Sequence, residues 1–248
     1  MGNETKKGLN TNSNVYTIVY SAILVVIVAF LLAFVYQSLK GLQDANVALD
    51  KKKQILYSLN IRDLDDAAAS AKYDEVVISD DVIDIDGNVV EPQTVEKEKN
   101  KESNGFKLNS ADYKNNKLAV FVCQIDGVTK YVVPVYGMGL WGPINGYVAL
   151  NDDCETVYGA YFNHEGETAG LGAEIKDDRS WQEKFKDKKL FAPSGDKKKI
   201  ALSVEKNVKD ETTQVDAVTG ATLTSNGVRD MLKEGLEKYT TYFDKVKK

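Results

Sequence analysis

The hydrophobic pattern of the chain begins with an uninterrupted apolar run. Residues 15–36 read VYTIVYSAILVVIVAFLLAFVY, with no charged residue, glycine or proline. A helix of this length spans roughly 33 Å, enough to cross the hydrocarbon core of a bilayer, which is about 30 Å thick. A cleaved signal peptide would have a shorter apolar region followed by small residues, whereas Tyr36 is followed by Gln-Ser-Leu-Lys. The pattern therefore predicts one uncleaved N-terminal transmembrane helix.

The next segment keeps apolar residues at helical spacing. Its leucines are Leu42, Leu49, Leu56 and Leu59. This spacing allows a stalk that continues the membrane helix, a helix that begins the soluble part, or a helix that packs on a neighbouring membrane protein. We expect four parts: an N-terminal tail at 1–14, the transmembrane helix at 15–36, a helical stalk at 37–61 and a domain at 62–248.

The first part of the soluble domain is acidic and polar. Residues 63–76 predict a short helix, and residues 82–90 predict a hairpin around Asp86-Gly87. Residues 91–105 read as a polar linker or an exposed loop.

Strand patterns dominate after the linker. Runs rich in β-branched and aromatic residues, bounded by Gly, Asn or Asp, lie at 117–127, 129–137, 146–151, 155–163 and 198–206. Amphipathic helices are predicted at 179–191 and 225–248. The first places Trp181 and Phe185 four residues apart, and the second aligns Val228, Leu232, Leu236, Tyr239 and Phe243. The predicted fold class is α+β, an antiparallel sheet flanked by helices.

Composition and charge exclude several classes of function. The 248 residues include 32 Lys+Arg and 37 Asp+Glu, and three of the basic residues are arginines, which argues against binding to nucleic acid. His164 is the single histidine, so a histidine-rich metal site is excluded, and Cys123 and Cys154 have no metal-ligand spacing. We therefore expect no metal. Spacing does not decide whether the two cysteines form a disulfide.

The charges beside the apolar run bear on membrane orientation. Lys6 and Lys7 precede the run, whereas Lys40 and residues 51–53, all lysine, follow it. Counting basic residues alone favours a cytoplasmic domain. This preference is weak because long domains are translocated largely regardless of charge.

The first glycine-rich stretch formally matches a dinucleotide-binding fingerprint. Residues 137–142 read GMGLWG, but the fingerprint requires a helix directly afterwards, and residues 143–146 lead into a strand. We reject the dinucleotide reading. The stretch is either a connection that brings Trp141 close to a flat ligand or a structural loop with a core tryptophan.

The second glycine-rich stretch, residues 166–172, reads GETAGLG. Glycines permit close approach of the backbone, so the loop could wrap a ligand, with Thr168 and backbone N–H groups as donors. An ordinary hairpin loop explains the pattern equally well. We interpret His164, which precedes the stretch, as a surface or loop histidine rather than a catalyst.

The third stretch, residues 216–225, reads DAVTGATLTS and precedes the C-terminal helix. Unpaired N–H groups and the positive end of the helix dipole favour phosphate at such a position. The simpler interpretation is helix capping by Thr224 or Ser225, which does not by itself require the preceding D-x-x-T-G-A-T.

The string at 216–222 resembles the flavinylation motif of the covalent FMN-binding domain family. Blocks of sequence also resemble the family formed by the C subunits of the Na⁺-translocating NADH:quinone reductases, and they stand in that family's order. These blocks are residues 139–150, 166–175, 181–191 and 219–228. The resemblance covers most of the chain except 62–105. Thr219 replaces the commoner serine, and Ala169 stands where the family usually has proline, which would loosen that loop.

The resemblance implies that a flavin transferase attaches FMN through its phosphate to Thr222. Asp216 would position that threonine or guide the transferase. The other residues implied to bind the cofactor are Leu140, Trp141, Glu167, Thr168, Gly170, Leu171, Thr219, Gly220, Ala221 and Thr224. No residue of this chain is expected to be catalytic, since an electron relay needs no acid–base pair.

The resemblance also implies an electron-transferring subunit of a Na⁺ pump, with other membrane subunits as partners and no complete NADH:quinone activity in this chain alone. It implies a single-pass protein of the bacterial inner membrane with its domain on the periplasmic side, against the charge count. Two alternatives stay open: the flavoprotein subunit of the related Rnf ferredoxin:NAD⁺ complex, and a flavin-free, membrane-anchored assembly module.

Overall fold

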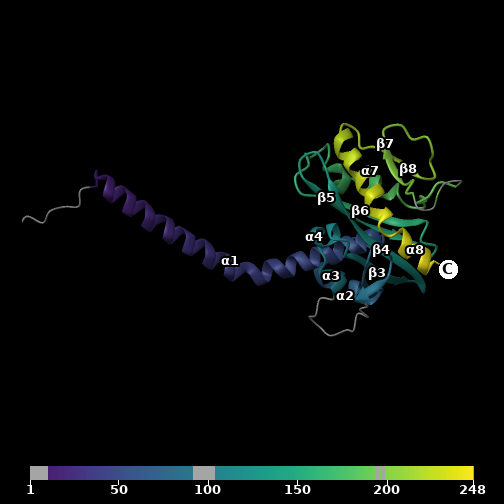
Figure 1. Cartoon of the computed structure of the whole chain (residues 1–248), viewed down its shortest axis with the longest axis horizontal. Coiled ribbons are helices and arrows are strands. Elements are labelled where there is room, and N and C mark those ends of the chain that lie inside the picture. The colour runs from purple at the N-terminus through teal and green to yellow at the C-terminus, as the bar shows by residue number, and fades with distance from the viewer. Residues whose placement is uncertain (1–10, 92–103, 194–195, 197–198, 248) are drawn as a thin grey trace, which may run out of the picture. The chain divides into compact units, whose positions relative to one another are not determined.

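The computed structural model describes residues 11–91, 104–193, 196 and 199–247 (Figure 1). The chain forms two compact units, residues 1–48 and 49–248. Most of the expected linker at 91–105 lies outside the described residues.

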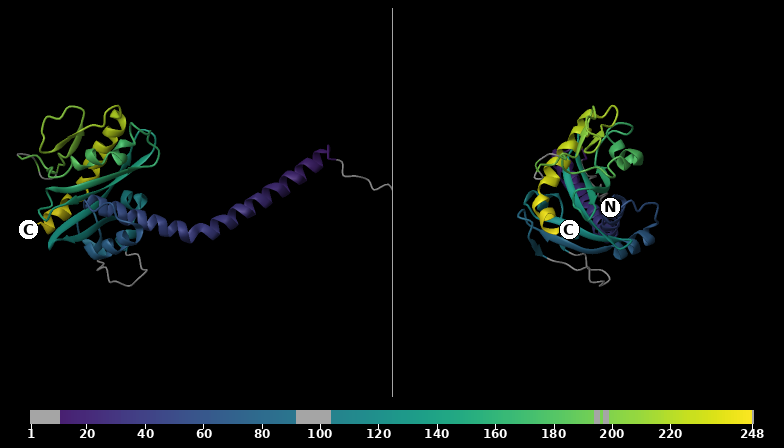
Figure 2. Two further views of the ribbon diagram at one scale, coloured as in Figure 1. Left: turned by 180° about the vertical axis from the view of Figure 1, so that it is seen from behind. Right: turned by 90° about the vertical axis from the view of Figure 1, so that its right-hand side faces the viewer.

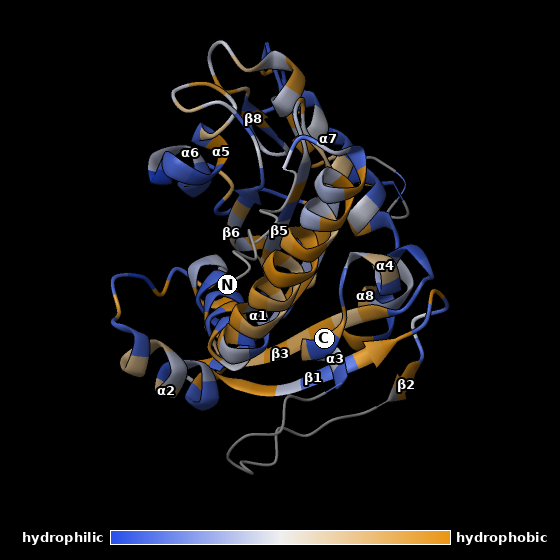
Figure 3. Cartoon of the chain, turned by 90° about the vertical axis from the view of Figure 1, so that its left-hand side faces the viewer, coloured by the Kyte–Doolittle hydropathy of each residue, from blue (hydrophilic) through white to orange (hydrophobic). Residues whose placement is uncertain are grey.

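A single helix, α1 (Asn14–Ser58), contains both the predicted membrane helix and most of the predicted stalk. It is long and apolar enough to cross a membrane, and the large apolar side chains of the apolar run are exposed. Most of its ribbon has the colour of hydrophobic residues in Figure 3. The helix ends three residues before the predicted stalk does. Asn60 adopts a left-handed φ of 60°, and the Ile61 amide donates to the Leu56 carbonyl. This geometry is a Schellman motif, which satisfies the last carbonyls of the helix.

The second unit contains a six-stranded antiparallel sheet in the order β2-β1-β3-β4-β5-β6. Its strands are β1 (Val77–Ile83), β2 (Val89–Glu91), β3 (Leu118–Ile125), β4 (Val128–Met138), β5 (Pro143–Leu150) and β6 (Val157–His164). The predicted hairpin around Asp86-Gly87 and the four predicted strands between 117 and 163 are confirmed. Ile125 pairs with Val128, so Asp126 and Gly127, both with positive φ, form the two-residue turn between β3 and β4.

Alternating side chains of the strands are buried on both faces of the sheet. The C-terminal helices, yellow in Figure 2, lie against one of these faces. On β4, Val133 and Val135 belong to the main hydrophobic cluster, together with α7 (Thr222–Glu237) and α8 (Thr240–Val246), whereas Val132 points to the other face. The last turns of α1 cover that other face, where the Tyr57 ring contacts Tyr161 at 5.2 Å between centroids. Short helices α2 (Asp66–Val76), α3 (Asn104–Lys107) and α4 (Ser110–Lys114) complete the flanking layers.

The helix predicted at 179–191 is shorter than expected. Helix α5 (Glu174–Asp177) is followed by α6 (Arg179–Glu183), and the helix stops there. The chain then runs beside the edge strand β6, where the Asp187 amide donates to the Val157 carbonyl and Leu190 donates to Glu155. Pairing with an open strand edge prevails over helix propensity here, while the predicted burial of Trp181 and Phe185 is confirmed.

The C-terminal helix predicted at 225–248 is two helices, and the first begins three residues earlier than expected. All five residues of its predicted apolar face are buried. A further strand, β8 (Gln214–Asp216), was not predicted, and it pairs in parallel with β7 (Ser203–Glu205). The predicted strand at 198–206 is confirmed only over the residues of β7.

The packing around α6 yields a stability prediction. Phe185 is fully buried, and its ring lies 5.0 Å from Phe162 and 5.2 Å from Trp181 between centroids. Phe185→Ala should lower the free energy of unfolding by about 3–5 kcal/mol, because it removes apolar contacts and leaves a cavity. Denaturant titration of the full chain in detergent measures this loss. A loss below about 1 kcal/mol would contradict the packing.

The two cysteines are free thiols and are fully buried. Burial raises the pKa of Cys154 to about 12 and also raises the pKa of Cys123, because it disfavours the thiolate. A raised pKa keeps a thiol protonated and unreactive below that value. We therefore expect no reaction with a thiol reagent at pH 8 in the folded protein and reaction of both thiols after denaturation. Rapid labelling of the folded chain would contradict this expectation.

Candidate functional site

Three connections meet at one end of the sheet. They are residues 139–142 between β4 and β5, residues 165–172 after β6, and the turn at 217–221 between β8 and α7. A Cβ atom on Gly220 would lie 2.9 Å from Leu171 Cδ2, and one on Gly172 would lie 2.6 Å from Thr224 Oγ1. A Cβ atom on Gly139 would lie 3.0 Å from Glu167 Cδ, which joins the first stretch to the second. The two glycine-rich stretches and the third stretch, widely separated in sequence, therefore form one site.

The turn before α7 exposes Thr222. The Ala221 amide donates to the Val218 carbonyl over 3.1 Å, and Gly220 takes a φ of +77°, which glycine accommodates without strain. Thr222 is the first residue of α7 and is exposed. The hydroxyl that the resemblance assigns to the cofactor is thus accessible at a helix N-terminus.

The interpretation that Thr224 or Ser225 caps α7 is wrong. The cap position is Ala221, and within the described chain no side chain caps the helix. Thr224 and Ser225 are both buried inside the first turn, and Ser225 Oγ accepts from the Val218 amide over 3.1 Å. The first turn therefore keeps its amide groups available for an anion.

Exposed apolar side chains surround this turn. Trp141 is 69% exposed, which makes the core-tryptophan interpretation of its loop wrong. Leu140, Leu171 and Leu223 are also exposed, at 48%, 43% and 59%. Large apolar side chains gathered at the surface beside an uncapped helix suit a ligand with a flat apolar ring and an anionic tail. The exposed Thr168, Gly170 and Thr219 lie on the same loops.

Glu167 lies behind this surface. Its side chain is buried, and the residue is 8% exposed. Glu167 Oε1 accepts from the Trp141 amide over 2.9 Å, and Oε2 accepts from Thr224 Oγ1 over 2.5 Å. The Glu167 amide donates to His164 Nδ1 over 3.2 Å, and His164 is the last residue of β6 rather than a loop residue.

Asp216 ends β8 and is held by α6. Lys184 Nζ contacts both of its carboxylate oxygens at 3.0 and 2.9 Å, and Trp181 Nε1 donates to its carbonyl over 2.7 Å. Both partners of the ion pair are about half exposed, so the pair contributes no more than about 1 kcal/mol to stability. The contacts position the start of the 216–222 segment. Sequence reasoning missed Lys184, because nothing local connects it with a residue 32 positions away.

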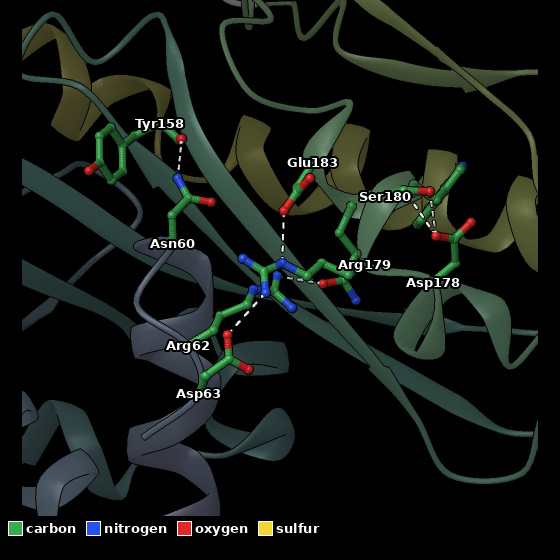
Figure 4. Close-up of polar contacts among 10 residues, drawn as sticks. Asn60, Arg62, Asp63, Tyr158, Asp178, Arg179, Ser180 and Glu183 are labelled. Carbon is green, nitrogen blue, oxygen red and sulfur yellow. Dashed lines mark hydrogen bonds and ion pairs between the residues drawn. The ribbon is translucent and has the colours of Figure 1, made fainter. Parts of the chain in front are cut away.

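The surroundings of α6 link the site to the segment that follows α1 (Figure 4). Arg62 donates to Gln182 Oε1 over 2.7 Å. Gln182 Nε2 donates to the carbonyls of Ile175 and Lys176 in α5, the helix that follows the second glycine-rich loop. Burial lowers the pKa of Arg62, and the nearby charge of Arg179 lowers it further.

Arg179 itself forms ion pairs with Asp63 at 3.2 Å and Glu183 at 2.8 Å (Figure 4). Asp178 caps α6 by accepting from the Trp181 amide over 3.1 Å, and it also accepts from Ser180 Oγ over 2.6 Å. Hydrogen bonds to the carboxylate, that of Ser180 foremost, lower the pKa of Asp178. These contacts fix the element that carries Trp181 and Lys184.

Residues 139–237 match the family model described as the FMN-binding domain. The matched region contains all three connections of the site and the whole of α7. The match supports FMN as the cofactor, in agreement with the exposed apolar surface and the uncapped helix. Fold and site together define a flavoprotein domain.

Comparisons with individual proteins define the family more closely. The C subunit of the Na(+)-translocating NADH-quinone reductase from Vibrio anguillarum is 32% identical over 205 residues, which cover 77% of this chain and 78% of that protein. The crystal structure of the corresponding C subunit from Parabacteroides distasonis has 33% identity and a TM-score of 0.72, and the match covers 83% of this chain and 96% of that one. The chain belongs to the family of C subunits of the Na(+)-translocating NADH-quinone reductases.

Other relatives match over a shorter region. The C subunit from Haemophilus ducreyi is 41% identical over 122 residues, so the match spans 48% of this chain and about half, 46%, of that relative. The resemblance to the family inferred from the sequence motifs is confirmed, as is the α+β class with an antiparallel sheet and a long apolar N-terminal helix. The apolar helix and the relatives, subunits of a membrane complex, fit a membrane anchor.

Proposed function

We propose that this chain carries FMN joined through its phosphate to Thr222, and that it relays electrons within a Na⁺-translocating NADH:quinone reductase. The observation that carries the proposal is the position of Thr222: an exposed hydroxyl on the first residue of α7, in a helix turn that no described side chain caps. A phosphate at that hydroxyl would meet amide groups and the positive end of the helix dipole.

The attachment is a phosphoryl-type transfer onto Thr222. The Thr222 hydroxyl oxygen would form a bond to the flavin phosphate, and its proton would pass to a base of the flavin transferase. The phosphorus–oxygen bond that breaks would lie within the pyrophosphate of a flavin donor such as FAD, with AMP as the leaving group. No oxidation occurs, and the diester keeps one negative charge beside α7.

The remaining site residues hold and shape the environment of the cofactor. Leu140, Trp141 and Leu171 offer apolar surface to the ring, while Thr168 and the backbone at Gly170 offer polar groups. Thr219, Gly220 and Ala221 form the turn that presents Thr222, and Asp216 anchors its start. Bound FMN supplies one- and two-electron transfer, which the apolar surroundings tune.

Membership of the family supports the wider assignment. Its partners would be the other membrane subunits of the complex and, during maturation, the flavin transferase. We place the domain on the periplasmic side of the bacterial inner membrane, because the family resemblance outweighs a weak count of flanking lysines. Complete NADH:quinone activity would require the assembled complex.

Fluorescence in a denaturing gel tests the proposal and separates it from the flavin-free assembly module. The full chain is produced with and without a flavin transferase, and the gel is illuminated with ultraviolet light. We expect a fluorescent band at the mass of this chain only when the transferase is present. A dark band in the presence of an active transferase, verified on a known substrate protein, would overturn the proposal.

A further inference from the structure

We infer that Glu167 is a positioning residue, which acts on the cofactor site by holding two of its connections together; the inference rests on the proposed function. Its carboxylate accepts from the Trp141 amide through one oxygen and from Thr224 through the other. Trp141 belongs to the first glycine-rich loop and Thr224 to the first turn of α7. One buried side chain therefore sets the spacing between the exposed tryptophan and the acceptor helix.

The surrounding backbone is shaped to admit this carboxylate. A Cβ atom on Gly139 would overlap Glu167 Oε1, and one on Gly172 would overlap Oε2. Two glycines thus flank the carboxylate, one from each glycine-rich stretch. This explains the two glycine positions by close approach to a side chain of the chain itself.

The contacts also show why the role is indirect. Both carboxylate oxygens are engaged by the protein, and the residue is 8% exposed. Thr224, 1% exposed, likewise turns its hydroxyl inward to Glu167. A hydrogen bond to a buried carboxylate is stronger than one between neutral groups. Loss of the Glu167 carboxylate should therefore displace the Trp141 loop and also lower the stability of the fold.

The test uses the full chain in detergent, with the apo protein measured first. Hydrogen exchange of the Trp141 amide reports the Glu167 contact directly, without any cofactor. We expect Thr224→Val and Glu167→Ala to slow the initial rate of FMN attachment about tenfold or more, and Glu167→Ala to speed exchange of this amide by a similar factor.

Thr213→Val is the matched control. Thr213 is 2% exposed, and its hydroxyl donates to Asp210 Oδ2 over 2.8 Å. The substitution therefore also removes a hydrogen bond from a buried threonine to a carboxylate, but in the turn before β8. Its attachment rate should stay within about twofold of wild type. A merely structural role for Glu167 predicts the opposite pattern: melting temperatures fall in all variants, while attachment rates of the folded fraction stay equal.

Glu167→Gln keeps the inference falsifiable if an alanine variant does not fold. The amide side chain has the same shape, accepts from Trp141 and donates to the Thr224 oxygen, but through weaker, neutral hydrogen bonds. We therefore expect partial rescue: faster attachment and slower exchange of the Trp141 amide than in Glu167→Ala. Attachment as slow as in Glu167→Ala would overturn the inference in favour of a requirement for charge. If the wild type itself takes no flavin, the proposed function fails, while the exchange measurement still decides the role of Glu167.

Discussion

Thr222→Val is expected to abolish covalent flavin while leaving the domain folded. Valine has nearly the shape of threonine but has no hydroxyl oxygen to form the phosphoester. Thr222 is exposed at the start of α7, and its side chain caps no part of the helix, so its replacement costs little stability. Gel fluorescence should fall to background, and the melting temperature should change by no more than about 2 °C.

Two further variants make the result specific. Thr222→Ser keeps a hydroxyl and should retain attachment. Thr241→Val makes the same change at an exposed threonine of α8 and should leave fluorescence at the wild-type level. Full fluorescence in Thr222→Val would show that the flavin is attached elsewhere.

Gly227→Ala should produce a large loss of stability. Gly227 lies in α7, and a Cβ atom there would overlap the carbonyl oxygen of Met138 and lie 3.3 Å from the Cα atom of Gly139. These are backbone atoms of the strand end that leads into the Trp141 loop, so they cannot rotate away. We expect a cost of about 3 kcal/mol, which corresponds to a melting temperature lower by about 6–12 °C.

Gly41→Ala is the matched control. Gly41 is also a helical glycine, but among the described residues no atom lies within 4 Å of the position that a Cβ atom would take there. Alanine favours a helix over glycine by up to about 1 kcal/mol, so the variant should be as stable as wild type or slightly more stable. Calorimetry measures the melting temperatures of Gly227→Ala and Gly41→Ala for comparison. Equal melting temperatures would contradict the close approach of α7 to the sheet.

Patterns within short stretches of sequence gave the reliable predictions. The buried apolar face of α7 and α8 could be predicted from apolar residues that repeat every 3.6 positions. The hairpins could be predicted from Asp-Gly pairs between two strand patterns. The proposed flavin acceptor, which stays a prediction, could be named from the sequence because its motif occupies seven consecutive positions, 216–222. The prediction of a continuous helix over 179–191 was wrong beyond α6. The edge of β6, distant in sequence, offers backbone hydrogen-bond partners to the residues after α6.

Contacts between distant segments could not be predicted. The strand β8 is three residues long and pairs with β7 in parallel, so no local turn marks it. Glu167 could be named from its motif, but the direction of its carboxylate depends on Thr224, 57 residues away. The ion pair between Lys184 and Asp216 could not be predicted for the same reason, since the fold, rather than the local sequence, brings the two charges together.

The proposed bond between Thr222 and FMN is the central claim of the functional assignment, and mass spectrometry of the peptide that contains residues 216–228 tests it most directly. The chain is produced with the flavin transferase, digested under denaturing conditions and fragmented. We expect a mass increment of FMN less one water, localised to Thr222. An unmodified peptide from a preparation that is fluorescent in the gel, or an increment on Thr219 or Thr224, would contradict the assignment.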